Sequence, residues 1–186
     1  MAQPKTQSRP GRPHSSRRAF VGLGAVVALI SLIWAGGADA QRLRSREPLN
    51  PAKAQTLPAS PLVIQSAEAL HPFTVELAES ESQRAIGLMH RNFLASDRGM
   101  LFDFYVEQPE QFWMRNTFIP LDMLFIRATG EIVFIAEETI PHSDKPVGPT
   151  RPVRAVLEVP GGTAKRLGIK AGDTVRHEIF GNLPQP

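Results

Sequence analysis

The chain contains no cysteine, so disulfide bonds, thiolate nucleophiles and cysteine-based metal sites are all excluded. An excess of basic residues is also lacking outside the N-terminal segment. Residues 1–40 hold five basic residues and one acidic residue, whereas residues 61–186 hold 12 basic and 16 acidic residues. Because nucleic-acid binding requires a concentrated basic surface, we expect no nucleic-acid partner for this later part of the chain.

Common catalytic motifs are absent as well. The sequence has no G-x-S-x-G or H-E-x-x-H pattern, and His71, His90, His142 and His177 are far apart along the chain. The glycine-bearing segment 161–165, GGTAK, lacks the Gly-Lys-Ser/Thr ending of a phosphate-binding loop. We therefore expect no metal and no cofactor, and the sequence leaves open whether the protein is an enzyme.

Residues 1–40 have the three-part organisation of an export signal. A basic polar segment precedes the apolar run FVGLGAVVALISLIWA and the small-residue sequence GGADA, which predicts cleavage between Ala40 and Gln41. Residues 16–21, SRRAFV, resemble the twin-arginine export motif; a general secretory signal containing two arginines is the competing interpretation. We predict a periplasmic or secreted protein, and the alternative is an inner-membrane protein anchored by an uncleaved N-terminal segment.

The rest of the chain is predicted to be a linker followed by one domain. Residues 41–60 contain three prolines, several charges and little apolar periodicity, which is typical of a disordered linker. Residues 61–186 are long enough to bury one hydrophobic core.

Short apolar runs predict that this domain is mainly β. The segment SESQRAIGLMHR predicts a helix, with Ser80 and Gln83 at the spacing of a capping box, and residues 162–167 predict a second short helix. Seven or eight short strands with one or two short helices indicate a compact β-sandwich or barrel-like single domain. The strand-like runs are PLVIQ, HPFTVELAE, GMLFDFY, QFWMRNT, LDMLFIRA, EIVFIAE, RAVLEVP and VRHEIF.

Several of these segments together resemble a known family. They are GLMHR (87–91), GMLFDF (99–104), FWMRNTFIPLDMLFI (112–126), GEIVFI (130–135) and VRAVLEVPGG with the following GIKAGD (153–173). Their order and spacing are similar to the bacterial and archaeal domain-of-unknown-function family numbered 192, over residues 72–180. The resemblance implies a small β-rich domain, often exported or lipid-anchored, without a settled biochemical role. His90 departs from the pattern, because that position is often aromatic.

The longest of these segments places polar residues in an apolar run. If residues 112–117 form a strand that turns back antiparallel to residues 121–126, Arg115 and Asp122 lie close enough to pair. One interpretation is a buried structural ion pair, since buried charges require partners.

The second interpretation is a ligand site built from the same residues. Arg115, Asn116 and Asp122 would line a cleft with Arg91 and Trp113 at its wall, an arrangement suited to a small polar or carbohydrate-like ligand. Two weaker candidates are Asp103, as a possible acid, and His142, in the long loop of residues 139–152.

We therefore expect an exported cell-envelope protein that binds a small polar ligand or an envelope protein. Membrane contact is expected only through the signal segment, transiently or as an anchor. One alternative is a carboxylate-dependent envelope hydrolase that pairs Asp122 with Asp103 or Glu76. The other alternative is a purely structural or accessory factor.

Overall fold

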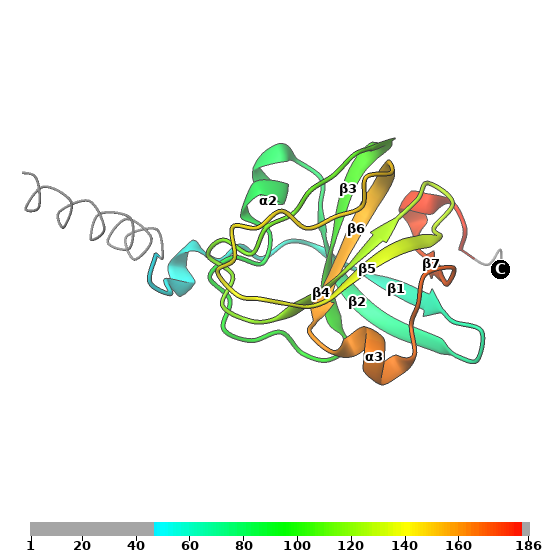
Figure 1. The fold of residues 1–186 in the computed structure, drawn as a ribbon, viewed down its shortest axis with the longest axis horizontal. Helices are drawn as coiled ribbons and strands as arrows, with labels where there is room; N and C mark the ends of the chain where they lie inside the picture. The colour runs from blue at the N-terminus through cyan, green and yellow to red at the C-terminus, as the bar shows by residue number, and fades with distance from the viewer. Residues whose placement is uncertain (1–46, 184–186) are drawn as a thin grey trace, which may run out of the picture. The chain divides into compact units, whose positions relative to one another are not determined.

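The computed structural model describes residues 47–183, so the expected signal segment and cleavage site lie outside the described residues. Seven strands form one sheet in the order β5-β4-β6-β3-β2-β1-β7 (Figure 1). The strands are β1 (Ala59–Gln65), β2 (Leu70–Ala78), β3 (Arg98–Gln108), β4 (Leu121–Ile126), β5 (Ile132–Thr139), β6 (Val153–Pro160) and β7 (Thr174–Arg176). The helices are α2 (Glu81–Ile86), α3 (Thr163–Leu167) and the short 3-10 helices η1 (Pro51–Lys53) and η2 (Glu178–Phe180). No helix of the described part is long and apolar enough to span a membrane.

The two outer strands of the sheet curl round and meet. Glu131, just before β5, forms a bridge with Thr174 at the start of β7. Backbone hydrogen bonds run from Ile132 N–H to the Asp173 carbonyl at 2.9 Å and from Val175 N–H to the Gly130 carbonyl at 2.7 Å. The expectation of a mainly β, compact single domain is confirmed, and of the two architectures the barrel-like one is present.

One pair of neighbouring strands is parallel. Strands β2 and β3 run in the same direction and are joined by a connection that contains α2. The predicted capping box starts this helix: Ser80 Oγ accepts the Gln83 N–H at 3.2 Å, and Gln83 Oε1 accepts the Ser80 N–H at 2.9 Å. This crossover connection places α2 next to β3, where Arg84 of the helix donates to the Asp103 carbonyl of the strand.

The sheet buries apolar side chains on both of its faces. The interior cluster receives side chains from all seven strands, among them Leu101 and Leu157. The second cluster lies on the opposite face, because Met100, Phe102 and Val156 alternate with those residues along β3 and β6. All six residues of β4 are buried, as expected for a strand covered on both faces. The second cluster lies beneath α2 and the irregular segment 110–120.

The prediction of a strand at residues 112–117 is wrong. Only Phe112 forms a β-bridge there, with Val147, and Asn116 has a left-handed backbone with φ 53°. The alternation of faces inferred for this segment therefore does not exist. The predicted last strand is also shorter than VRHEIF, since β7 ends at Arg176 and His177 starts η2.

The ordered domain begins before residue 61. Strand β1 starts at Ala59, and the side-chain amide of Gln55 donates to the carbonyls of Gln83 at 2.8 Å and Gly87 at 3.0 Å. The Leu57 N–H donates to Glu76 Oε2 at 2.7 Å. Part of the segment expected to be a disordered linker is thus bound along the domain.

Candidate functional site

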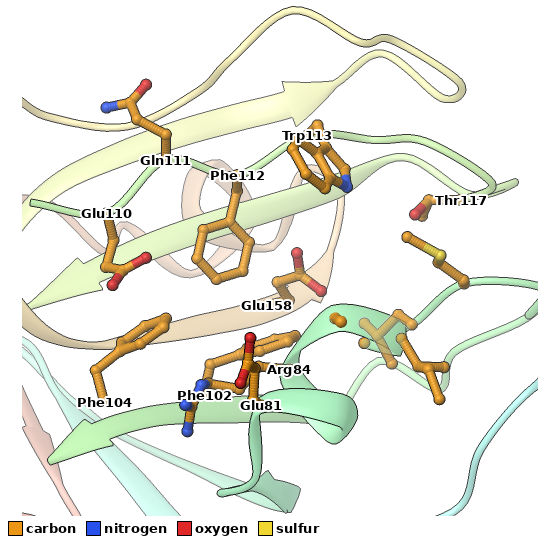
Figure 2. A pocket seen from close by; sticks show the side chains of 15 residues that line it. Glu81, Arg84, Phe102, Phe104, Glu110, Gln111, Phe112, Trp113, Thr117 and Glu158 are labelled. Carbon is orange, nitrogen blue, oxygen red and sulfur yellow. The ribbon is translucent and has the colours of Figure 1, made fainter.

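A cavity of about 260 Å³ lies on the outer face of the sheet, between α2 and the segment 110–117 (Figure 2). Its floor is formed by β3 and β6, which contribute Phe102, Phe104 and Glu158. One wall is α2 with the turn that follows it, residues 81–89. The other wall is residues 110–113, and Thr117 also contributes to the lining.

Glu158 is the distinctive group of this cavity. It lies in β6 between Met100 of β3 and Met123 of β4, and only 5% of it is exposed. No hydrogen bond or ion pair among residues 47–183 involves its carboxyl group. Burial raises the pKa of Glu158 from 4.5 to about 8, because an ionised carboxylate is poorly solvated there. Its carboxyl group lines the cavity, so the cavity is the side from which a partner can reach its oxygens.

Phe112 holds the wall formed by residues 110–113, called the upper wall below, against the floor of the cavity. Its backbone exchanges two hydrogen bonds of 2.8 Å with Val147, which anchors an otherwise irregular segment. Its ring meets Phe102 edge-on at a centroid distance of 5.1 Å and Phe104 edge-on at 6.3 Å. Edge-to-face contacts of this kind are favourable, so the aromatic lining has a defined geometry.

Gly87 allows the helical wall to approach the floor closely. It ends α2 with φ 51°, a conformation that favours glycine. A Cβ atom at this position would lie 3.2 Å from Cζ of Phe102. The glycine of GLMHR therefore has both a conformational and a packing role at the edge of the cavity.

Of the five residues predicted to bind ligand, Trp113 lines this cavity. Its ring lies at the rim, 48% of the residue is exposed, and the Arg115 guanidinium stacks on it 4.9 Å from the ring centroid. Arg115 itself points outward, where its Nε donates to Asp144 at 2.7 Å. Both members of that ion pair are about half exposed.

The expected pairing of Arg115 with Asp122 is not present. Asp122 is fully buried and accepts three backbone N–H groups, from Glu138 at 2.8 Å, Gly162 at 3.0 Å and Ala164 at 2.8 Å. The left-handed backbone at Asn116 breaks the strand geometry on which the pairing depended. Asp122 is thus a structural residue that joins β4 to the start of α3.

Arg91 lies in a different place from Trp113. Its guanidinium makes a two-pronged pair with the Glu76 carboxylate at 2.7 and 2.8 Å and donates to the Gln55 carbonyl at 2.6 Å. Arg91 and Glu76 border a second hollow of about 370 Å³ that Phe93 also lines. Because Arg91 and Glu76 already satisfy each other, this hollow has less chemical reason to bind a ligand.

Asn116 and His142 belong to a strained group of loops. His90, Asn116 and His142 all have left-handed backbones, with φ of 61°, 53° and 61°. The His90 N–H donates to the Asn116 carbonyl at 2.9 Å, and the His142 N–H donates to the Thr117 carbonyl at 3.2 Å. The loops therefore meet at residues 116–117 and hold the end of the upper wall.

The side chains of Asn116 and His142 contact different parts of the protein and do not converge on one site. Asn116 Nδ2 donates to Glu47 Oε2 at 3.3 Å. The His142 ring packs edge-on against Phe118 at a centroid distance of 4.4 Å, and its buried Nδ1 has no hydrogen-bond partner in the described part of the chain. Neither residue lines the cavity that contains Glu158.

The acids considered for hydrolysis are all engaged in protein contacts. Asp103 pairs with Arg154 at 3.2 Å and accepts the Tyr105 N–H at 2.8 Å. Glu76 binds Arg91, and Asp122 binds backbone groups, as described above. The described residues also contain no cluster of three or more His, Asp or Glu side chains suited to a metal.

Sequence reasoning missed Glu158, although a signal was present. An acidic residue in the apolar run VRAVLEVP has no obvious reason to stand in a central strand. The run predicts a strand and contributes to the family resemblance, but neither inference draws attention to the acidic side chain of Glu158. The alternation of faces places Glu158 with Val156, on the face that carries the cavity.

Two solved structures resemble this chain. One is a crystal structure from Sinorhizobium meliloti of a protein named as a candidate transcription regulator; it is 43% identical, with a TM-score of 0.66, over 67% of this chain and 98% of that one. The other, from Novosphingobium aromaticivorans, is a protein of unknown function; it is 36% identical, with a TM-score of 0.64, over 69% of this chain and 97% of that one.

The comparison with protein families gives the same answer as the resemblance seen in the sequence. No curated protein matches the chain. The model of the family DUF192, described as an uncharacterised ACR, matches residues 62–177, which include every strand from β2 to β7 and most of β1. The chain belongs to the DUF192 family.

Proposed function

We propose that the protein is a small-molecule binding module, exported to the cell envelope, that holds a ligand in the cavity between α2 and segment 110–117. The observation that carries the proposal is Glu158, a carboxyl group that is 5% exposed and lies at the floor of a cavity rich in aromatic side chains, whose walls also carry Glu81, Arg84 and Glu110. Ligand pockets combine apolar walls with a few polar groups that fix orientation. Glu158 has no structural partner among residues 47–183, so it is available to a ligand.

The cavity favours a ligand with an apolar, ring-sized body. Four aromatic side chains line it, and they are Phe102, Phe104, Phe112 and Trp113. Leu88 and Met89 add aliphatic surface. A carbohydrate-like ligand, as expected from the sequence, would bury hydroxyl groups against the four aromatic rings, which cannot replace the hydrogen bonds lost to water. The proposal therefore shifts from a polar ligand to one that is mainly apolar with a single polar group.

A nucleic-acid function is not proposed. The protein from Sinorhizobium meliloti is named as a candidate regulator of transcription, and that description applies to that protein. In this chain, residues 61–186 hold 12 basic and 16 acidic residues, which opposes binding to a polyanion.

The test uses probes that share one ring and differ in the attached group. Benzyl alcohol, benzyltrimethylammonium and benzoate are titrated into the full-length chain, with methyl glucoside as a polar comparison. The chain has five methionines, so methionine-methyl NMR gives few signals, and Met89 is the one that lines the cavity. Fluorescence of Trp113 in a Trp34→Phe variant provides a second readout.

We expect at least one ring probe to shift the Met89 signal saturably and methyl glucoside to leave it unchanged. Ala85 lines the cavity from α2, so Ala85→Phe should block the shift. Ser82→Phe, on the same helix but outside the lining, is the matched control and should preserve it. If no ring probe affects Met89 or Trp113, the proposal is wrong.

A further inference from the structure

The unpartnered carboxyl of Glu158 restricts the kind of polar group that a ligand can bring. Burying a carboxyl group without hydrogen bonds costs free energy, and that cost is recovered when a ligand supplies a partner. An anionic group is disfavoured because Glu81 and Glu110 also line the cavity and because ionised Glu158 would repel it. The remaining options are a neutral group and a cation.

The charged groups around the cavity favour the cation. Besides Glu158, the lining contains Glu81 and Arg84 from α2 and Glu110 from the upper wall. The strand neighbours of Glu158, Met100 and Met123, carry no charge. The cavity therefore has three acidic groups and one basic group within its lining.

The one basic group is already engaged. Arg84 Nη1 donates to the carbonyl of Glu79 and to that of Asp103 at 2.9 Å. Its guanidinium also lies over the Phe104 ring, 5.2 Å from the centroid. Because these contacts hold Arg84 against the protein, its charge is directed at backbone carbonyls instead of the centre of the cavity.

The aromatic lining adds an independent attraction for positive charge. Phe102, Phe104, Phe112 and Trp113 line the same cavity as Glu158 (Figure 2). Arg84 already lies over Phe104 and Arg115 over Trp113, whereas the structure of residues 47–183 places no guanidinium over Phe102 or Phe112. Aromatic faces attract ammonium groups, and the attraction is larger where water is excluded. A site that combines several aromatic rings with a buried acid suits a ligand that is both apolar and positively charged.

We propose that the cavity binds an organic cation, an ammonium group on an apolar body, with the positive charge held between the Glu158 carboxylate and the aromatic lining. This inference rests on the proposed function, because it names the ligand class of the same cavity. It assigns to Glu158 the role of the ligand's counter-ion.

Binding must then be coupled to a proton. In the free protein the pKa of Glu158 is raised to about 8 by burial, so the carboxyl is mainly protonated at neutral pH. A cation binds the ionised form, so binding at pH 7 should release about 0.9 proton. Affinity should rise about 50-fold between pH 6 and pH 8 and level off above that range.

The experiment compares benzyltrimethylammonium with benzyl alcohol on the full-length chain. The first probe has a permanent charge, so any pH dependence belongs to the protein. Dissociation constants are measured from the Met89 methyl signal at pH 6, 7, 8 and 9. Calorimetry at pH 7 in two buffers with different ionisation enthalpies measures the proton release directly.

Two variants identify the group responsible. Glu158→Gln keeps the shape of the side chain but cannot ionise, so it should weaken binding of the cation at pH 8 at least tenfold and remove the pH dependence. Glu68→Gln removes an exposed acid in the β1–β2 turn, outside the lining, and should change neither. This control separates the site from the general attraction of an acidic protein.

The outcomes distinguish this inference from the proposed function. A cation that binds more tightly than benzyl alcohol at pH 8, with the pH dependence and its loss in Glu158→Gln, supports the inference. If benzyl alcohol binds at least as tightly at pH 8, or if cation binding is independent of pH, the cation assignment is wrong while ligand binding stands. If neither probe nor benzoate reaches Met89, both are overturned.

Discussion

The carboxylate of Asp122 in β4 accepts the backbone N–H of Ala164 in α3 at 2.8 Å, across 42 positions of sequence. The N-cap residue of helix α3 is Gly162, which has no side chain to cap the helix. Asp122 therefore supplies from a neighbouring strand the acceptor that an N-cap residue normally provides. This contact joins the central sheet to the helix that precedes the last strand.

Replacing Asp122 by Asn should destabilise the fold. The amide keeps the shape of the carboxylate but loses its charge and presents N–H groups to backbone donors, so we expect a loss of about 2–4 kcal/mol. Urea unfolding of the full-length chain measures the change. Asp144→Asn, in the half-exposed pair with Arg115, is the control and should cost less than about 1 kcal/mol. Equal effects in the two variants would contradict the structural role of Asp122.

Glu158 should make the stability of the protein fall as pH rises. Its pKa is raised to about 8 in the folded state from 4.5, so between these values the folded protein binds more protons than the unfolded chain. Stability is therefore highest below pH 4.5 for this group and declines by up to about 1.4 kcal/mol per pH unit until pH 8.

The measurement is the difference in unfolding free energy between wild type and Glu158→Gln from pH 5 to pH 9. Taking the difference removes the contribution of other titrating groups. We expect the variant to become progressively more stable than wild type as pH rises, with Glu68→Gln remaining parallel to wild type. A constant difference between wild type and Glu158→Gln over this range would show that the buried carboxyl does not titrate as described.

Export should depend on the paired arginines near the N-terminus. Replacing Arg17 and Arg18 by Lys keeps the positive charge and removes the twin-arginine pattern, so the chain should accumulate inside bacterial cells. Fractionation followed by immunodetection measures the distribution, and Arg9 and Arg12 replaced by Lys provide a matched control. Unchanged export of the Arg17 and Arg18 variant would indicate the general secretory route.

Much of the fold was predictable because local patterns and tertiary packing agree. The alternating strand of residues 72–78, the capping box at Ser80 and Gln83, and the mainly apolar run of β4 each specify their structure within a short window. The family resemblance over residues 72–180 is confirmed by the family match over residues 62–177. In each case the signal lies in neighbouring residues.

The candidate site was less predictable because its geometry depends on backbone conformation and long-range contacts. Residues 112–117 have the apolar content of a strand, but the positive φ at Asn116 and the bridge from Phe112 to Val147 make the segment irregular. That single difference separates Arg115 from Asp122. Glu158 shows the opposite case. The sequence predicts its strand, but the absence of a partner for its carboxyl group among residues 47–183 depends on the side chains of the neighbouring strands.

The placement of Glu158 on a central strand has a consequence for how the specificity of the proposed binding cavity would be altered. The cavity floor belongs to β3 and β6, whose backbones are hydrogen-bonded to neighbours on both sides, whereas its walls are a six-residue helix and an irregular segment. Substitutions at wall positions such as Ala85 or Gln111 reshape the entrance without touching the sheet ladder. In protein engineering, Glu158 and the sheet can therefore be kept unchanged while the wall residues are varied to fit other ligands.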